Sequence, residues 1–230
     1  NGPQTVINGF LNAVGEEGNL LMPTSPVSKL QYDFIQENPK FNVLQTVSKM
    51  GIVSETFRQM SGVKRSAHPT EPVSAFGPLA SYFTQDHFGE NTPYTKNSPW
   101  YRLMEKNGKI LYVGVTLINA GTNLHVLEDL TSFKYPVYHE NEFEVEVTLE
   151  NGEKQKMRTK VHNPEFSKRR RCDELIPHFI ADNVLKEVKL GKAHCLLLDA
   201  KGMLDSMLKR YEQNGTTMYT PNGEKIEGYE

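Results

Sequence analysis

A histidine and a glutamate three residues apart form the first pair in this sequence that could do acid–base chemistry. His125 and Glu128 follow closely on an apolar, β-branched run. If Thr122 caps a helix, His125 is the third helical residue and shares a face with Glu128. The positive end of a helix disfavours imidazolium, which keeps the ring neutral and able to accept a proton near pH 7. The pattern predicts a general base with a carboxylate partner; the alternative is a solvated His–Glu pair on an exposed helix.

A second group of polar residues could cradle an anion. Arg65, Ser66, His68 and Ser74 lie within ten positions of one another. An arginine offers a forked donor to phosphate or carboxylate, and hydroxyls with free loop amides can complete the site. The alternative is an ordinary solvated loop. His87 follows the same stretch and is interpreted as a structural histidine.

The sequence offers little for metal or covalent chemistry. It contains no HExxH, CxxC or HxxxH spacing, no GxSxG, and no Walker A or GxGxxG loop. We therefore expect no metal site. Cys172 follows Arg169, Arg170 and Arg171, whose charges would lower the pKa of its thiol. Cys172 is the one candidate covalent nucleophile, with a bystander role as the alternative.

The elements that must position these residues alternate between helix and strand. Residues 19–22 and 109–115 are short, apolar and bordered by turn formers, which predicts buried strands. The predicted helices cover residues 5–15, 46–60, a segment capped by Ser74, a segment from Thr122, and residues 176–210 with an apolar interruption at 195–198. Residues 24–45 have weak periodicity and are predicted to be a loop. The alternation predicts an α/β fold.

Residues 140–162 have a different pattern, typical of a β-hairpin. Apolar and acidic residues alternate from Glu142 to Glu150, Asn151-Gly152 supplies a turn, and basic residues alternate along the return. Acidic side chains then face basic ones across the strands, which contributes about 0.2–1 kcal/mol per pair. The pattern predicts a solvated hairpin with an acidic and a basic strand.

Composition narrows the class of protein. The 230 residues carry 26 Lys and Arg against 28 Asp and Glu, a net charge of −2, which argues against a nucleic-acid-coating protein. The chain has no apolar run of roughly 18–20 residues, so no membrane partner is expected. Two cysteines and no signal-peptide pattern predict a reduced, cytoplasmic setting. With no long linker, residues 1–230 are predicted to form a single domain.

The order of these motifs resembles the aminoglycoside 3-N-acetyltransferase family, which lies outside the GNAT fold. The matching residues are Leu21-Met22-Pro23-Thr24, Met50-Gly51, Glu55-Thr56-Phe57-Arg58, Gly62, Arg65-Ser66-Ala67-His68-Pro69, Ser74, Ala75-Phe76-Gly77, Ala80, His87, Ser98-Pro99, Leu103, and residues 108–115 and 122–128. The resemblance is specific over residues 20–130 and loose further on.

The resemblance implies an acetyl-CoA-dependent N-acetyltransferase on a three-layer α/β/α sandwich with a central mixed sheet, from which the hairpin protrudes. His125 would be the general base that takes a proton from the amine of an aminoglycoside-like acceptor, with Glu128 positioning the amine or the imidazole. Arg65, Ser66, His68 and Ser74 would line the CoA side. A homodimer remains among the partners considered.

One departure from the family pattern leaves alternatives open. The family begins with a further strand and a Ser- and Gly-containing loop that contacts the pantetheine arm, whereas this sequence starts at Asn1 within the first helical region. We expect that first strand to be missing from the sequence. Two other hypotheses follow: a CoA-binding member with weak or no antibiotic acetylation, acting on another amine or as an interaction protein, and a ping-pong acyltransferase through Cys172.

Overall fold

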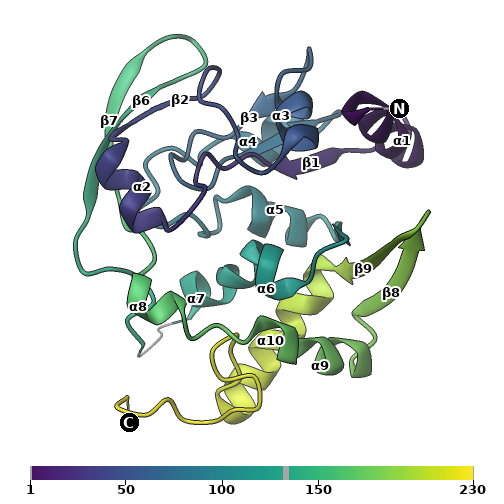
Figure 1. The fold of residues 1–230 in the computed structure, drawn as a ribbon, viewed down its shortest axis with the longest axis vertical. Coiled ribbons are helices and arrows are strands. Elements are labelled where there is room, and N and C mark those ends of the chain that lie inside the picture. Colours follow the sequence, from purple (N-terminus) through teal and green to yellow (C-terminus); the bar gives the residue numbers. More distant parts are fainter. Residues whose placement is uncertain (1, 132–134, 230) are drawn as a thin grey trace. The chain divides into compact units, whose positions relative to one another are not determined.

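The computed structural model describes residues 2–131 and 135–229, and its contacts divide them into two compact units (Figure 1). The first unit comprises the described residues up to Pro99 together with Tyr138–Pro164. The second comprises the described residues of Trp100–Val137 and those from Glu165 onward. Within the described ranges, no helix combines the length and the hydropathy that a membrane crossing requires.

The first unit contains an antiparallel sheet flanked by helices. Its strand order is β1 (Leu20–Pro23), β4 (Val73–Phe76), β3 (Lys64–Arg65). Helix α1 (Pro3–Val14) packs on α3 (Ile52–Arg58), and α4 (Ala80–Thr84) follows β4. Ile7, Met22 and Phe57 are fully or almost fully buried where these elements meet. Burial of apolar side chains from three separate segments therefore holds this layer together.

A second sheet of the first unit contains the predicted hairpin. Strand β6 (Phe143–Thr148) pairs antiparallel with β7 (Lys154–Thr159) and parallel with β2 (Lys40–Asn42). Helix α2 (Gln31–Glu37) covers one face, where Ile35, Phe41 and Val147 are buried. On the exposed face Glu144 pairs with Lys156 at 2.6 Å. The alternation of apolar and charged residues thus forms the hairpin that the sequence predicts.

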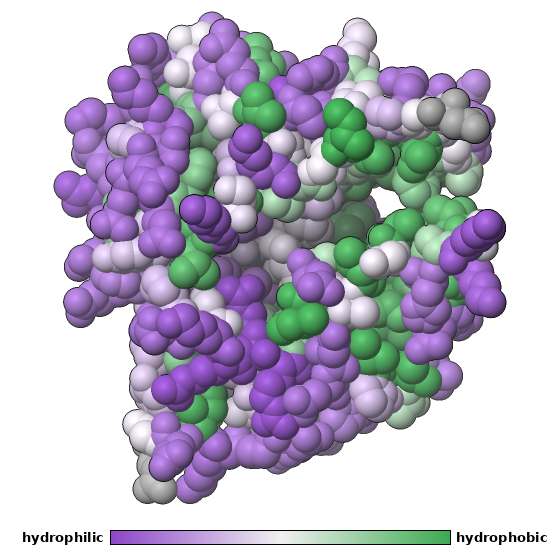
Figure 2. Space-filling view, viewed as in Figure 1, coloured by the Kyte–Doolittle hydropathy of each residue, from purple (hydrophilic) through white to green (hydrophobic). Residues whose placement is uncertain are grey.

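The second unit is built on one antiparallel sheet. The central strand β9 (Ala193–Asp199) lies between β5 (Lys109–Val113) and β8 (Leu185–Leu190). Helix α10 (Ala200–Asn214) follows β9 directly, and the Asp199 carboxylate accepts from the Gly202 N–H at its start. Hydrophobic side chains reach the surface over β8 and β9 (Figure 2). Leu111, Val113 and Leu190 are among the exposed apolar residues of this unit.

Short helices complete the second unit. They are α5 (Pro99–Glu105), α6 (Leu117–Ala120), a 3-10 helix (Thr122–His125), α7 (Val126–Leu130), α8 (Pro164–Ser167), a 3-10 helix (Cys172–Leu175) and α9 (Ile176–Ala181). Leu124, Val126 and Leu127 are buried, and α7 contacts α10. The segment that carries His125 is therefore fixed by apolar contacts on both sides of the histidine.

Several local predictions are wrong for reasons that the packing makes clear. Ser74 does not cap a helix: it lies in β4, whose backbone pairs on both sides, and Gly77 ends that strand with a φ of +118°. A Cβ at Gly77 would lie 2.3 Å from the Gly18 carbonyl oxygen, so only glycine fits this close approach. The predicted loop 24–45 contains α2 and β2, and the helix predicted over 46–60 shortens to α3.

The region predicted as helical over residues 176–210 contains a hairpin. The apolar patch at 195–198 is the centre of β9, and β8 and β9 separate α9 from α10. Thr122 does not cap a regular helix either: it starts a 3-10 turn without a side-chain cap, and His125 ends that turn. The interruption at 195–198 was predicted, and the helical prediction is wrong over the rest of the hairpin, residues 185–194, because the pairing of strands leaves no 3.6-residue period to recognise.

The mixed α/β fold is confirmed, and its predicted layering is not. The described residues form three separate three-stranded sheets, so a central mixed sheet between two helical layers is not observed. The parallel pairing seen in this part of the chain, β2 with β6, lies within the sheet of the hairpin. The prediction of a single acetyltransferase domain over residues 1–230 stays a prediction.

Candidate active site

The segment after β5 places His125 in a fixed position. The Tyr112 hydroxyl of β5 donates to the Asn123 carboxamide oxygen at 2.5 Å. The Asn123 Nδ2 lies 3.0 Å from the sulfur of Met203 in α10. Asn123 thus ties the 3-10 turn to both the sheet and the long helix, two residues before the histidine. Because all three side chains are buried, the position of His125 is set by packing and not by a mobile surface helix.

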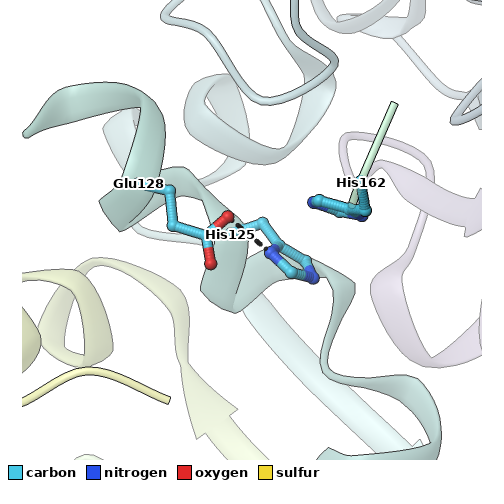
Figure 3. Close-up of side chains that lie close together, drawn as sticks. All are labelled: His125, Glu128 and His162. Atoms are coloured by element: carbon cyan, nitrogen blue, oxygen red, sulfur yellow. Dashed lines mark hydrogen bonds and ion pairs between the residues drawn. The ribbon is translucent and has the colours of Figure 1, made fainter. Parts of the chain in front are cut away.

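His125 and Glu128 are hydrogen-bonded and buried (Figure 3). The His125 Nδ1 lies 2.8 Å from the Glu128 Oε2, and the two residues are 2% and 5% exposed. The spacing of three residues brings the side chains together, as the sequence predicts. The alternative of a solvated pair on an exposed helix is wrong. Figure 3 also draws His162, which belongs to the other compact unit.

Burial determines the protonation of the histidine. Burial lowers the pKa of His125 well below its ordinary value, and the charge of Arg170 lowers this pKa further. The imidazole is therefore neutral at neutral pH. A neutral ring has one nitrogen that donates and one that accepts. If Nδ1 donates to the ionised Glu128, the lone pair is on Nε2, which can take a proton. The sequence attributed the neutral ring to a helix dipole; desolvation is the larger cause.

A tyrosine, a cysteine and an arginine surround this pair within the same unit. Burial raises the pKa of the Cys172 thiol to about 12, with Arg170 opposing the shift and Asp173 and Glu128 adding to it. Burial also raises the pKa of Tyr219, and the Glu128 carboxylate raises it further. The thiol is protonated at neutral pH, so the three arginines do not make Cys172 a nucleophile. The sequence prediction for the thiol had the wrong sign because it ignored burial.

Two acidic residues that follow Cys172 bond to other parts of the protein. The Asp173 carboxylate accepts from the Thr116 hydroxyl at 2.8 Å and from the Ile118 N–H at 2.9 Å, at the start of α6. Glu174 pairs with Arg171 at 2.5 Å. These two carboxylates therefore stabilise the protein itself, and Glu128 is the acidic group in contact with His125.

The four residues predicted for the CoA side form one buried cluster in the first unit. Arg65 is 8% exposed, and Ser66, His68 and Ser74 are fully buried. The Arg65 guanidinium donates to the carbonyl oxygens of Val43, Thr46 and Thr24 and to the Thr24 hydroxyl. Burial lowers the pKa of Arg65 to about 9. With four of its five N–H groups shown in these bonds, at most one remains for a ligand.

Ser66 and two histidines continue this cluster. The Ser66 hydroxyl accepts from the Val73 N–H at 3.0 Å and lies 2.9 Å from the His87 Nδ1. The His87 Nε2 lies 2.9 Å from the Pro93 carbonyl oxygen, so Nε2 carries the proton and Ser66 donates to Nδ1. The His68 ring stacks on His87 with centroids 4.9 Å apart. These hydroxyl and imidazole groups are satisfied within the protein.

His68 and Ser74 occupy equally closed positions. The His68 Nε2 lies 3.2 Å from the Thr159 hydroxyl, and burial lowers the pKa of His68 well below its ordinary value. The Ser74 hydroxyl lies 3.1 Å from that of Thr24. A cavity of about 490 Å³ opens beside this cluster, with Lys64, Arg65 and His87 among its lining residues. The structure thus brings the four predicted residues together and places Arg65 at the cavity wall.

Sequence reasoning missed Tyr112, Asn123 and Tyr219. Asn123 lies in the motif that the family resemblance used, but a single asparagine gives no signal of a tie between β5 and α10. Tyr219 is more than 90 positions from His125, and its approach to Glu128 depends on tertiary structure alone. The sequence pattern indicates Arg170 only as one member of a basic run.

Comparison with known proteins gives a consistent result. A family model described as aminoglycoside 3-N-acetyltransferase matches residues 1–212. Aminoglycoside N(3)-acetyltransferase VII of Streptomyces paromomycinus is 31% identical over 142 residues, which cover 56% of this chain and 49% of the relative. Aminoglycoside N(3)-acetyltransferase IV of Salmonella sp is 32% identical over 137 residues, 59% of this chain and 49% of the relative. The chain spans about half the length of the curated relatives it matches.

Solved structures show the same fold. The complex of AAC-IIIb with CoASH has a TM-score of 0.73 at 22% identity and covers 94% of this chain and 85% of that one. The YokD protein from Bacillus subtilis has a TM-score of 0.73 at 23% identity, with coverage of 93% and 81%. AAC-VIa bound to sisomicin has a TM-score of 0.74 at 23% identity, with coverage of 92% and 85%.

Proposed function

We propose, from the premise that this chain belongs to the aminoglycoside 3-N-acetyltransferase family, that it transfers an acetyl group from acetyl-CoA to an amine of an aminoglycoside-like acceptor. The observation that carries the proposal is the buried hydrogen bond between His125 and Glu128. CoASH is bound to the structurally similar AAC-IIIb, and sisomicin to the similar AAC-VIa. That this chain binds CoA and an aminoglycoside is part of the proposal.

In the proposed reaction His125 acts as the general base. Its Nε2 takes a proton from the acceptor ammonium, and the freed amine attacks the thioester carbonyl carbon. The nitrogen of the tetrahedral intermediate loses its second proton to solvent, the C–S bond breaks to expel the CoA sulfur, and the proton held on His125 passes to that sulfur. The amide and CoA are the products, so no covalent enzyme intermediate is needed. A positioned base of this kind contributes roughly 10²–10⁴-fold to the rate.

Glu128 keeps the base in its working form. An ionised carboxylate at 2.8 Å accepts the Nδ1 proton and so leaves Nε2 as the acceptor. The same carboxylate stabilises the imidazolium that forms during the reaction, which the burial of the ring would otherwise oppose. Glu128 can also attract a cationic amine, because unlike Asp173 and Glu174 it contacts His125 directly.

The buried cluster in the first unit is proposed to support the wall of the acetyl-CoA side of the site. Its members are Arg65, Ser66, His68 and Ser74. Their hydrogen bonds to the protein support a role in holding backbone segments in place, with Arg65 alone reaching the wall of the cavity. Lys64 is exposed beside Arg65 and lines the same cavity. We propose that this exposed cation, more than the buried four, is available to a CoA phosphate.

Acetyl transfer with defined amines tests the function. The purified chain is mixed with acetyl-CoA and gentamicin, sisomicin or apramycin, and both thiol release and the mass of the acceptor are measured. We expect stoichiometric thiol release and one added acetyl group. Stabilisation by CoA without transfer to any amine would contradict the proposal and support the alternative, a CoA-binding member with another amine or an interaction role.

His125→Asn gives the matching test of mechanism. Asparagine keeps a donor near the position of Nδ1 and removes Nε2, so transfer should fall while folding is kept. His194→Asn is the control, because His194 is exposed on β9 of the same unit. The predictions of a cytoplasmic setting, of no metal or nucleic-acid partner, and of a homodimer stay predictions.

A further inference from the structure

A second cavity lies within the second unit, beside the C-terminal segment. Its volume is about 420 Å³. The lining residues are Lys168, Arg169, Arg170, Arg171, Tyr219, Thr220, Glu224, Lys225 and Ile226. The viewed surface around α8 and the C-terminal segment is mainly hydrophilic (Figure 2). Five of the nine lining residues are cationic and one is acidic, which makes this cavity unlike the first.

The protein neutralises only part of this positive charge. Arg171 is paired with Glu174 and, at 2.8 Å, with Glu224. Lys168 is paired with Glu165 at 2.7 Å. Lys225 is exposed and has no ion pair with any residue that the structure describes. Even with the three paired carboxylates counted, positive charges outnumber negative ones around the cavity, so it favours an anion.

One buried polar atom of the lining residues lacks a hydrogen-bond partner among the described residues. It is the Nε of Arg170, whereas the hydroxyl of Tyr219, which is 3% exposed, is hydrogen-bonded to the Glu128 carboxylate. Buried donors without a partner are rare, because each costs a desolvation penalty. Such a donor at a cationic cavity is typical of a binding site whose ligand supplies the missing acceptor.

The backbone supports this geometry. The Arg171 N–H donates to the Met218 carbonyl oxygen at 2.7 Å, which joins the basic run to the turn that carries Tyr219. The Phe166 and Tyr219 rings pack with centroids 4.6 Å apart, and the Arg169 guanidinium lies over Phe166 at 5.7 Å. These contacts join the basic run on which Arg170 lies to the turn that carries Tyr219.

We propose that this cavity binds a phosphate-bearing small molecule, with Arg170 and Lys225 as its principal cationic contacts. The guanidinium group matches the geometry of phosphate oxygens, and a lysine adds a flexible point charge. A cavity of 420 Å³ has room for more than one phosphate group. The ligand could be the phosphates of CoA or a separate phosphorylated compound. A polycationic aminoglycoside is excluded by the charge of the walls.

Pyrophosphate is the probe for the test. Its binding to the full chain is measured by isothermal titration calorimetry at two salt concentrations, for the wild type and for Lys225→Gln and Arg170→Gln. The control is Lys192→Gln, an exposed lysine in the turn between β8 and β9, away from the cavity lining. Thermal unfolding of each variant checks that it folds; Lys225 is a surface residue, so Lys225→Gln keeps the test decisive if Arg170→Gln misfolds.

We expect saturable binding that weakens with salt and falls at least about fivefold in each cavity variant but not in Lys192→Gln. Competition by CoA, with weaker competition by 3′-dephospho-CoA, would identify the phosphates of CoA as the source. Binding that CoA does not displace would identify a separate phosphorylated ligand. If neither pyrophosphate nor CoA binding responds to Lys225→Gln or a folded Arg170→Gln, the proposal is wrong. Acetyl transfer is not part of this measurement, so failure here leaves the proposed function untouched.

Discussion

Two buried polar clusters of this protein differ in how their hydrogen bonds are used. Around Arg65 the guanidinium, the hydroxyls and the imidazoles bond to backbone carbonyls, amides and one another. Around His125 the ring has Glu128 on one side, and nearby Arg170 buries its Nε without a partner in the described chain. The first cluster is closed and the second has unused hydrogen-bonding capacity.

This difference separates residues that hold the fold from residues that can act on a ligand. Satisfied buried networks rigidify a protein, and removing one member leaves the others unpaired. Groups with unused capacity, in contrast, cost stability unless a ligand engages them. We therefore expect substitutions at Arg65 to reduce stability and substitutions at His125 to reduce rate.

The largest expected effect is on the rate of acetyl transfer in His125→Asn. Loss of the Nε2 acceptor should reduce kcat by roughly 10²–10⁴-fold, the usual contribution of a general base. The measurement is steady-state CoA release with saturating acetyl-CoA and an aminoglycoside, compared with His194→Asn. Full turnover by His125→Asn would show that His125 is not the base.

Arg65→Met should cost stability on a comparable energy scale. Methionine fills part of the volume but leaves the carbonyl oxygens of Val43 and Thr46 and the hydroxyl of Thr24 without their donor. At about 1–3 kcal/mol per unsatisfied buried group, we expect a loss of roughly 3–5 kcal/mol in the free energy of unfolding, measured in urea.

Lys64→Met is the matched control for this loss. Lys64 is the exposed neighbour of Arg65 in β3 and should change stability by less than about 0.5 kcal/mol. Unchanged stability of Arg65→Met, together with a raised KM for acetyl-CoA, would instead make Arg65 a direct ligand contact. The closed character of the first cluster would then be disproved.

The free energy of unfolding should decrease as the pH is lowered, because each of the two clusters contains a buried histidine. Burial lowers the pKa of His68 and of His125 below the ordinary 6.5. Between the folded and unfolded pKa values the unfolded chain binds more protons, so the penalty is absent above pH 6.5 and grows as pH falls below it. Each histidine should contribute up to about 1.4 kcal/mol per pH unit.

His125→Asn isolates one of these two contributions. The variant should lose one histidine's share of the slope below about pH 6.5, as followed by urea unfolding at each pH, and His68 should supply the remainder. The exposed His194→Asn variant should keep the full slope. An unchanged slope in His125→Asn would show that the ring titrates freely in the folded protein.

How much of this could be foreseen from the sequence depends on whether the signal is local. The His125–Glu128 contact requires only a turn of helical geometry, so a spacing of three residues predicts it. The hairpin over 140–162 follows from strict alternation around Asn151-Gly152. The same local reasoning failed at Ser74 and over the hairpin of β8 and β9, because a strand is defined by the neighbours it pairs with, which can come from distant parts of the chain.

The chemistry of a site depends even more on distant neighbours. The arginines before Cys172 predict a lowered thiol pKa, and burial among residues from other elements reverses it. Tyr219 and Arg170 adjoin the histidine pair only after the C-terminal turn is fixed by the Arg171–Met218 hydrogen bond. Desolvation is a property of the folded core, which one-dimensional spacing does not record.

The smallest expected effect is that of Cys172→Ala on acetyl transfer. A thiol with a pKa of about 12 is almost entirely protonated at neutral pH, and only the thiolate attacks a thioester efficiently. Its removal should therefore change kcat by less than about twofold, as should removal of Cys195, the other buried cysteine. Intact mass after incubation with acetyl-CoA alone should show no acetylated protein. An acetyl group on Cys172 that transfers to an added amine would overturn direct transfer, and would mean that Arg170 outweighs burial in the working enzyme.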